Sequence, residues 1–188
     1  MVMSMRVIAG KAKGRKLRAP AGDSVRPTSD KVKGAVFSVL AQYGPINSFL
    51  DLFAGSGAMG IEAWSRGATQ VVFVEKDRKA YQCLQGNLQT VGFAEAVLLP
   101  LDWQRALRQL AGTQFAVIYA DPPYTAALYP SIVSSVKEQG VLGPRGLLCL
   151  EHPKRIQLQL GDDWNLLKTK HYGETAVTYL TSSAAQLN

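Results

Sequence analysis

The sequence predicts an α/β protein whose core is a doubly wound, seven-stranded, mainly parallel sheet, preceded by a small basic hairpin and a helix. Two observations favour this fold. Strand-like and helix-like segments alternate from residue 48 to residue 151, and a glycine-rich turn follows the first of these strands. Such alternation gives right-handed βαβ units, and therefore a parallel sheet that helices cover on both faces.

The individual elements follow from apolar periodicity and from turn residues. Punctuating glycines predict a hairpin over 6–19, and a helical period predicts a helix over 30–43 that Gly44-Pro45 ends. Strands are expected at 48–53, 70–75, 96–99, 115–120 and 146–151, and helices at 58–66, 77–91, 102–110 and 126–139. Two more strands, 164–172 and 175–181, predict a closing antiparallel hairpin. We expect the N-terminal hairpin and helix (1–45) to form one domain and residues 46–188 the other.

The composition excludes several classes of protein. No apolar run approaches the roughly 20 residues that a membrane span needs. The two cysteines, Cys83 and Cys149, are far apart and lie outside any metal-binding spacing. We therefore expect a cytoplasmic protein without a metal site or a disulfide framework. Nothing in the sequence indicates an obligate oligomer, so a monomer is expected.

The positive charge is concentrated at the N-terminus. Residues 1–40 hold nine Lys and Arg against two Asp, whereas the rest of the chain is balanced. A folded, one-sided basic segment is typical of binding to a phosphate backbone; the alternative is a solvated basic tail. The candidate RNA-binding residues are Arg6, Lys11, Lys13, Arg15, Lys16, Arg18 and Arg26.

The loop after the first long strand indicates a nucleoside-containing cofactor. It carries the pattern G-x-G-x-x-G at Gly55, Gly57 and Gly60, and Glu75 lies 20 residues past Gly55 at the end of the next strand. The glycines permit a tight turn and close backbone approach, and the acid can bind both hydroxyls of a ribose. NAD and S-adenosylmethionine both satisfy this description.

Asp51 favours S-adenosylmethionine over NAD. It lies near the end of the predicted strand, four residues before Gly55. Its carboxylate would repel the pyrophosphate of a dinucleotide but would attract the ammonium and sulfonium groups of S-adenosylmethionine.

The loop after residue 120 indicates an amino-group substrate. In Asp121-Pro122-Pro123-Tyr124, the two prolines fix the backbone and remove two donors, and Asp121 is pushed into an extended conformation. The rigid acceptors that remain suit an amine with two N–H bonds to donate. Tyr124 offers a ring on which an extruded base can stack. In a doubly wound sheet, ligands bind outside the carboxyl ends of the strands where the winding reverses, which predicts that this loop and the glycine loop carry the chemistry.

These residues resemble the amino-methyltransferases. The chain more narrowly resembles the bacterial small-subunit ribosomal RNA guanine-N2 methyltransferase D family, through four stretches: Arg6–Gly10 with Lys13–Leu17, Arg26–Thr28, Asp51–Gly60 with Asp121–Tyr124, and Tyr172–Thr175. The resemblance implies a Rossmann-like class I methyltransferase fold and methyl transfer to the N2 amine of a guanine in ribosomal RNA or in an assembling small subunit. Adenine N6, a protein amide, and a non-catalytic RNA-binding assembly factor remain alternatives.

The resemblance also assigns roles to individual residues. It implies that Asp121, Pro122, Pro123 and Tyr124 are catalytic, and that the cofactor contacts are Asp51, Phe53, Gly55, Gly57, Gly60, Glu75, Asp102, Trp103 and Thr28. Asp102 would also suit a helix N-cap. The chain departs from the family at Lys31, Lys33 and Gly34, where arginines and then an acidic residue are usual. Lysine loses the bidentate geometry of arginine, so this departure puts any family salt bridge there in question.

Overall fold

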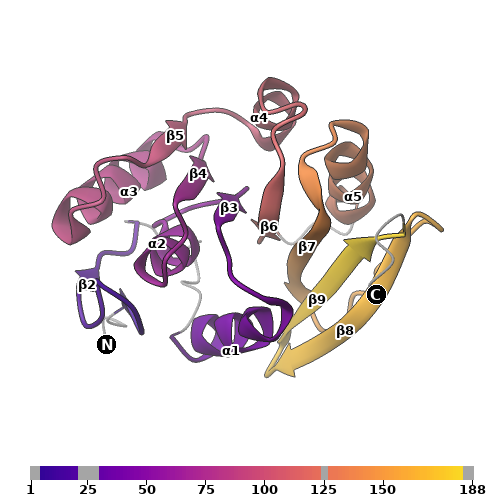
Figure 1. The fold of residues 1–188 in the computed structure, drawn as a ribbon, viewed down its shortest axis with the longest axis horizontal. Helices are drawn as coiled ribbons and strands as arrows, with labels where there is room; N and C mark the ends of the chain where they lie inside the picture. Colours follow the sequence, from indigo (N-terminus) through magenta and orange to yellow (C-terminus); the bar gives the residue numbers. More distant parts are fainter. Residues whose placement is uncertain (1–4, 21–29, 124–126, 184–188) are drawn as a thin grey trace. The chain divides into compact units, whose positions relative to one another are not determined.

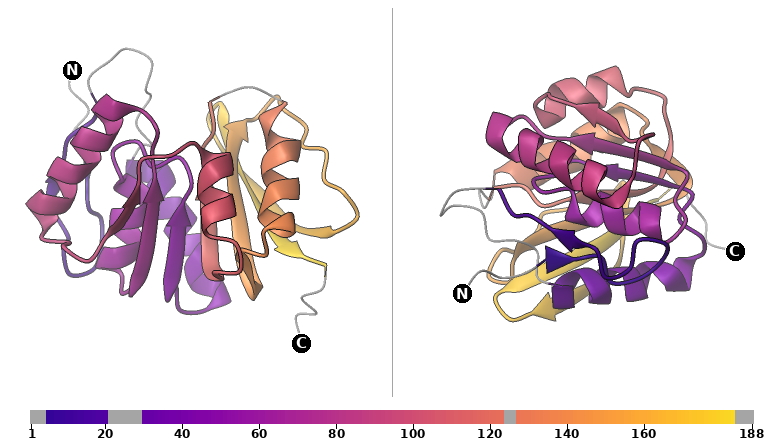
Figure 2. Two further views of the ribbon diagram at one scale, coloured as in Figure 1. Left: turned by 90° about the horizontal axis from the view of Figure 1, so that it is seen from above. Right: turned by 90° about the vertical axis from the view of Figure 1, so that its left-hand side faces the viewer.

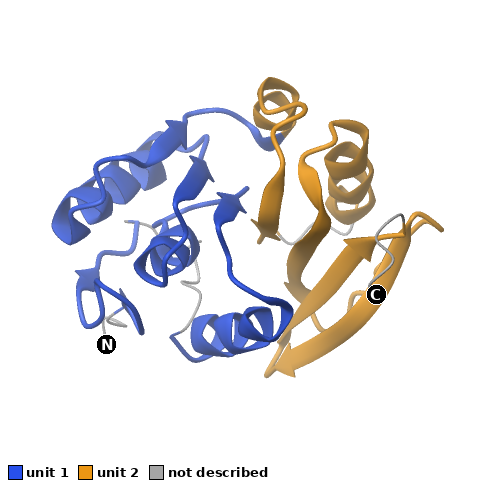
Figure 3. Cartoon of the chain, viewed as in Figure 1, with its two compact units in different colours: residues 1–103 blue, residues 104–188 orange. Residues whose placement is uncertain are grey.

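The computed structural model describes residues 5–20, 30–123 and 127–183. Three predicted site residues, Arg26, Thr28 and Tyr124, lie outside these ranges. The fold is the predicted mixed α/β class with a seven-stranded, mostly parallel sheet (Figure 1). The chain divides into two compact units, residues 1–103 and 104–188 (Figure 3). The predicted domain boundary at residue 45 stays a prediction.

The first unit contains the N-terminal hairpin and three parallel strands in the order β5-β4-β3. The hairpin pairs β1 with β2 in antiparallel register, as predicted. The elements of this unit are β1 (Met5–Arg6), β2 (Lys16–Leu17), α1 (Asp30–Leu40), the 3-10 turn η1 (Ala41–Tyr43), β3 (Ser48–Asp51), α2 (Ala58–Ser65), β4 (Gln70–Val74), α3 (Arg78–Val91) and β5 (Val97–Leu99). Helix α4 (Trp103–Gln109) begins at Trp103, the last residue of the first unit.

Helix α3 shows how local sequence sets the boundaries of an element. Asp77 is its N-cap, and the Asp77 side chain accepts a hydrogen bond from Ala80 N–H at 2.8 Å. Gly92 ends the helix with φ +79°, a left-handed conformation that glycine adopts without strain. Leu84 and Leu88 are buried on one face of the helix.

The hairpin is packed onto α2. Met5, Val7 and Leu17 are buried, and Lys11 N–H donates to the Ser65 carbonyl at 2.8 Å. Gly10 must be glycine, because a Cβ there would lie 1.8 Å from the Ser65 carbonyl oxygen. The hairpin and helix α2 lie side by side in the views of Figures 1 and 2. The hairpin is therefore part of the core of this unit and not a loose basic arm.

The second unit has four strands in the order β6-β7-β9-β8. Strands β6 and β7 are parallel, whereas β9 is antiparallel to both β7 and β8, which confirms the closing hairpin. The elements are β6 (Phe115–Ala120), α5 (Leu128–Glu138), β7 (Leu142–Pro153), β8 (Trp164–Tyr172) and β9 (Thr175–Ser182). Among the residues that the structure describes, no helix has the length and apolar character to span a bilayer.

Candidate functional site

The glycine loop is held directly by Glu75. Gly55 N–H donates to Glu75 Oε2 at 2.8 Å, and Asp77 N–H donates to Oε1 at 2.7 Å. Each carboxylate oxygen can accept two hydrogen bonds, so Glu75 keeps acceptor capacity for a ribose diol after both backbone bonds are made. The structure thus brings Glu75 and Gly55 together, as the sequence predicts.

The three glycines of the loop differ in what requires them. A Cβ on Gly57 would lie 2.3 Å from a methyl of Leu84, and one on Gly60 would lie 2.3 Å from the Phe73 ring. Both positions are therefore glycine because the core is tightly packed there. A Cβ on Gly55 would meet no atom of the described residues within 4 Å, and its φ is +54°. Of the three glycines, Gly55 is therefore the one with space beside it among the described residues, where a ligand can approach the backbone.

Asp51 is buried at the end of β3, 2% exposed, and it binds the start of α2. Its Oδ2 accepts a hydrogen bond from Gly60 N–H at 3.0 Å, in the first turn of the helix. Burial raises the pKa of Asp51 to about 7, the Gly60 hydrogen bond opposes the rise, and nearby Glu75 adds to it. Two carboxyl groups at one loop favour a cationic ligand, because a cation stabilises their ionised forms.

Phe53 and Trp103 lie together in the first unit. Their ring centroids are 6.5 Å apart with an interplanar angle of 42°. Both residues are partly exposed, as is Asp102. The aromatic pair that the resemblance assigns to the cofactor is therefore preassembled.

The second predicted loop follows β6 in the second unit. Asp121 is partly buried, Pro122 is buried and Pro123 is exposed. Ala120 of β6 pairs with Leu150 of β7 in parallel register, so Asp121 and Glu151, which come next in sequence, occupy corresponding positions on the two neighbouring strands.

A buried polar cluster that sequence reasoning did not single out lies at the end of β7. Glu151 accepts a hydrogen bond from the Tyr119 hydroxyl. His152 is 3% exposed; its Nδ1 lies 3.0 Å from the Pro153 carbonyl and its Nε2 lies 2.9 Å from Thr178 Oγ1. A carbonyl can only accept, so Nδ1 carries the proton and Nε2 accepts from the threonine hydroxyl. Burial lowers the pKa of His152, which keeps the ring neutral. Both ring nitrogens of His152 are thus used in contacts within the fold.

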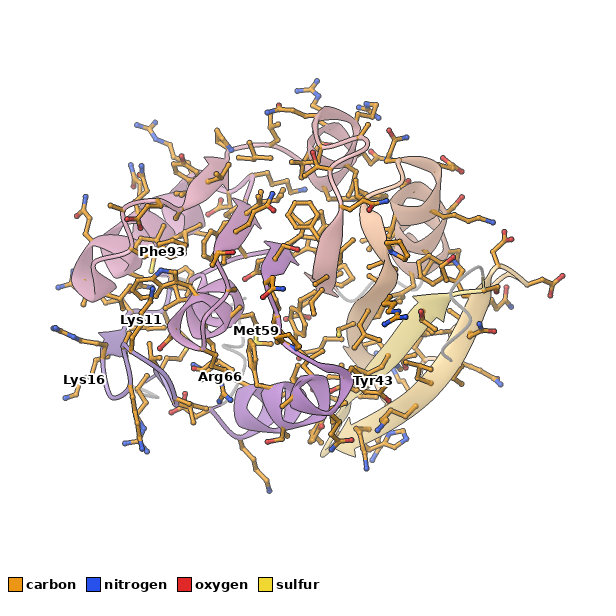
Figure 4. All side chains as sticks on the ribbon, in the orientation of Figure 1. Lys11, Lys16, Tyr43, Met59, Arg66 and Phe93 are labelled. Carbon is orange, nitrogen blue, oxygen red and sulfur yellow. The ribbon has the colours of Figure 1, made fainter. Side chains whose placement is uncertain are left out.

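The candidate RNA-binding residues of the hairpin are all exposed: Arg6, Lys11, Lys13, Arg15, Lys16 and Arg18. Among the described residues, the side chains of two of them also have partners. Arg6 forms an ion pair with Asp30 at 3.4 Å, and Lys11 Nζ lies 3.9 Å from the centroid of the Trp64 ring, close to Phe93 (Figure 4). The exposed charge of the hairpin is thus fixed to a folded support.

The departure at Lys33 has a structural explanation. The Lys33 side chain is fully buried in α1, where it donates to the Arg6 carbonyl at 2.6 Å and lies 3.5 Å from Glu62. Glu62, also fully buried, accepts from the backbone N–H groups of Ile8 at 2.8 Å and Ala9 at 3.0 Å. Lysine therefore keeps a salt bridge here despite the loss of bidentate geometry. Burial lowers the pKa of Lys33, and the carboxylates of Glu62 and Asp30 oppose that shift.

Comparison with known proteins places the chain in a family. The family model described as Conserved hypothetical protein 95 matches residues 5–181. Ribosomal RNA small subunit methyltransferase D of Haemophilus influenzae is 36% identical over 173 residues, covering 90% of this chain and 89% of that protein. The Escherichia coli K12 protein of the same name is 33% identical, covering 92% and 87%.

Solved structures agree with the sequence relatives. The structure of yhhF from Escherichia coli has a TM-score of 0.84 at 32% identity, covering 96% of this chain and 99% of that one. A hypothetical protein of Thermus thermophilus has a TM-score of 0.81 at 35% identity, covering 93% and 98%. The chain has the class I methyltransferase fold and belongs to the ribosomal RNA small subunit methyltransferase D family.

Proposed function

We propose that the chain transfers a methyl group from S-adenosylmethionine to the exocyclic N2 amine of a guanine in small-subunit ribosomal RNA. The observation that carries the proposal is the acceptor loop Asp121-Pro122-Pro123 directly after β6, in a chain whose curated relatives are named as ribosomal RNA methyltransferases. The partner would be ribosomal RNA or an assembling small subunit, met in the cytoplasm by a monomer.

The residues of the first unit fit S-adenosylmethionine. Glu75 has acceptor capacity for the ribose hydroxyls, Gly55 has space beside it among the described residues, and Asp51 supplies negative charge for a ligand that carries an ammonium and a sulfonium. Phe53 and Trp103 supply apolar surface for a planar ring. When bound, the cofactor supplies an electrophilic methyl group on a positively charged sulfur.

The acceptor loop orients the amine. The N2 lone pair of guanine is delocalised into the ring, so this nitrogen is a weak nucleophile. Hydrogen bonds from its two N–H groups to the Asp121 carboxylate and a proline carbonyl would localise the lone pair and fix its direction. Orientation of two bound reactants supplies up to about 7–11 kcal/mol of a barrier, so no strong general base is required. Methylation would make the amine nitrogen acidic, so its proton would pass to solvent after the transfer, and S-adenosylhomocysteine would be the leaving group.

The test is to map labelled methyl groups by mass on small-subunit ribosomal RNA treated with the purified protein. The wild type is expected to label guanine N2. Asp121→Ala should abolish transfer and leave the affinity for S-adenosylhomocysteine within a few-fold, because its side chain serves the amine. The exposed Glu138→Gln is the matched control and should be fully active. Label on adenine N6 or on a ribosomal protein would overturn the substrate assignment, and the absence of any label would favour a non-catalytic assembly factor.

Tyr124 gives a second test of the acceptor loop. If the ring stacks on the base, Tyr124→Phe should retain transfer and Tyr124→Ala should lose it. Equal losses in both variants would mean that the hydroxyl matters and that stacking is the wrong explanation.

A further inference from the structure

One side chain of α3 binds both the basic hairpin and the glycine loop. Asn87 Oδ1 accepts a hydrogen bond from Arg18 N–H at 2.8 Å, and its Nδ2 donates to the Arg18 carbonyl at 2.9 Å. The same Nδ2 donates to the Ser56 carbonyl at 2.8 Å. Arg18 directly follows β2, and Ser56 stands between Gly55 and Gly57. The amide thus bridges the two segments to which RNA docking and cofactor binding are assigned.

The bridge gives each polar group of a buried amide at least one partner. Asn87 is 1% exposed in the interior of α3, a position where asparagine is a poor helix former. A buried amide needs partners for its two N–H groups and its oxygen, and the three bonds provide them. The two bonds to Arg18 alone would leave one buried N–H without a partner. The partner that satisfies it is the Ser56 carbonyl of the glycine loop, so the amide that holds the hairpin is also bonded to that loop.

Other contacts fix the loop to the same parts of the unit. Leu84, one turn before Asn87 on the same helix face, fills the space that a Cβ on Gly57 would need. The Ser56 hydroxyl lies 3.8 Å from the sulfur of Met5 in β1. Ser56 is therefore bonded to the hairpin twice, directly through Met5 and indirectly through Asn87. Its neighbour Gly55 donates to Glu75, the residue that is expected to bind the ribose. Arg18 is thus connected to Glu75 through Asn87 and the backbone of Ser56 and Gly55.

We propose that Asn87 is a positioning residue that couples RNA binding on the hairpin to the order of the cofactor loop, so that RNA raises the affinity for the cofactor. RNA held by the exposed Arg18 side chain would restrict the backbone of residue 18, and Asn87 passes this restriction to Ser56. A loop that is already ordered loses less conformational entropy when the cofactor binds. Because linkage is reciprocal, the cofactor raises RNA affinity by the same factor. The inference rests on the proposed function, since it needs the hairpin to dock RNA.

The experiment measures the dissociation constant of S-adenosylhomocysteine by calorimetry for the full chain, with and without saturating small-subunit ribosomal RNA transcribed in vitro. In the wild type, RNA should tighten binding by about fivefold or more. In Asn87→Ala the ratio of the two constants should fall to about one, whereas Gln85→Ala, an exposed position on the same helix, should keep the wild-type ratio. Circular dichroism shows whether each variant is folded.

The outcomes separate this inference from the proposed function. Charge reversal at Lys13, Arg15 and Lys16 should weaken RNA binding and flatten its salt dependence; if neither happens, RNA docking by the hairpin fails. If docking holds but RNA leaves the wild-type cofactor affinity unchanged, or Asn87→Ala keeps the wild-type ratio, the coupling is overturned. Should Asn87→Ala fail to fold, amide hydrogen exchange at Gly55 and Gly57 of the wild type is measured instead. The coupling requires that RNA, without cofactor, slows this exchange, and unchanged exchange overturns it.

Discussion

Replacing Glu62 with glutamine tests whether the buried ion pair fixes the hairpin to the rest of its unit. The change keeps the shape of the side chain but leaves the Lys33 ammonium, which is fully buried, without its nearest carboxylate. Removing one partner of a buried pair costs about 3–5 kcal/mol. One of the two backbone donors, Ile8 or Ala9, would also face an amide N–H instead of an oxygen, with a penalty of about 1–3 kcal/mol that overlaps the first.

The hairpin is therefore expected to lose about 3–5 kcal/mol of stability. The loss cannot exceed the free energy needed to open the hairpin while the rest of the protein stays folded. Amide hydrogen exchange at Ile8 and Ala9 measures this opening, and a loss of about 3 kcal/mol should accelerate it roughly 100-fold. Adding Lys33→Met should restore part of the loss, since it removes a buried ammonium that has lost its nearer carboxylate. Exposed Glu95→Gln is the control and should change stability by less than about 0.5 kcal/mol.

The reasoning is refuted if Glu62→Gln costs under about 1 kcal/mol and leaves exchange at Ile8 and Ala9 unchanged. Asp30, 3.8 Å from Lys33 Nζ, and the Arg6 carbonyl would then suffice to hold the ammonium.

Three further changes test the site and the packing. The pKa of Asp51 is about 7, and a cationic cofactor favours the ionised form of its carboxyl group. Calorimetry should therefore show that cofactor affinity rises roughly five- to tenfold from pH 6 to pH 8 and falls as the carboxyl is protonated. A flat pH profile, identical to that of Asp51→Asn, would contradict this. Gly34→Ala should stabilise α1 by about 0.5–1 kcal/mol in urea titrations, because among the described residues the new Cβ would meet only an Ile8 methyl, at 3.5 Å; a lower midpoint would be the contrary result. Gly57→Ala should destabilise the protein clearly, because the Cβ collides with Leu84 and φ is +80°; unchanged stability and cofactor binding would show that the loop can shift.

Periodic and local signals predicted most of the fold. The closing strands over 164–172 and 175–181 were predicted nearly to the residue, because a Gly-Glu turn separates two clear strand patterns. Strand β7 was predicted too short: it begins at Leu142, where Gly143 and Pro144 conceal the strand pattern. Leu142 pairs with Phe115 and Leu147 pairs with Val117, so Gly143 and Pro144 lie at an irregularity of the parallel ladder, and such pairing is invisible in local sequence.

The site was only partly predictable for the same reason. The glycine loop and Glu75 obey a fixed spacing, so their contact could be expected. Glu62 and Asn87 carry no motif, and the hairpin residues that they bind lie 53 to 69 residues away. The burial of Lys33 could have been predicted from its position, because it shares an i, i+3, i+4, i+7 spacing with Val36, Phe37 and Leu40, the buried stripe of α1. Its charge instead suggested an exposed basic residue.

The long sequence separation of the hairpin contacts has a consequence for how the protein folds. Strands of two residues are too short to persist alone, so the hairpin depends on Glu62, Ser65 and Asn87, which are made much later in the chain. Contacts across such separations require a large loop to close first. The hairpin is therefore expected to dock late, after α2 and α3 have formed, and substitutions that loosen it should speed unfolding and leave the folding rate almost unchanged. The basic surface would thus reach its binding geometry only in the finished native state.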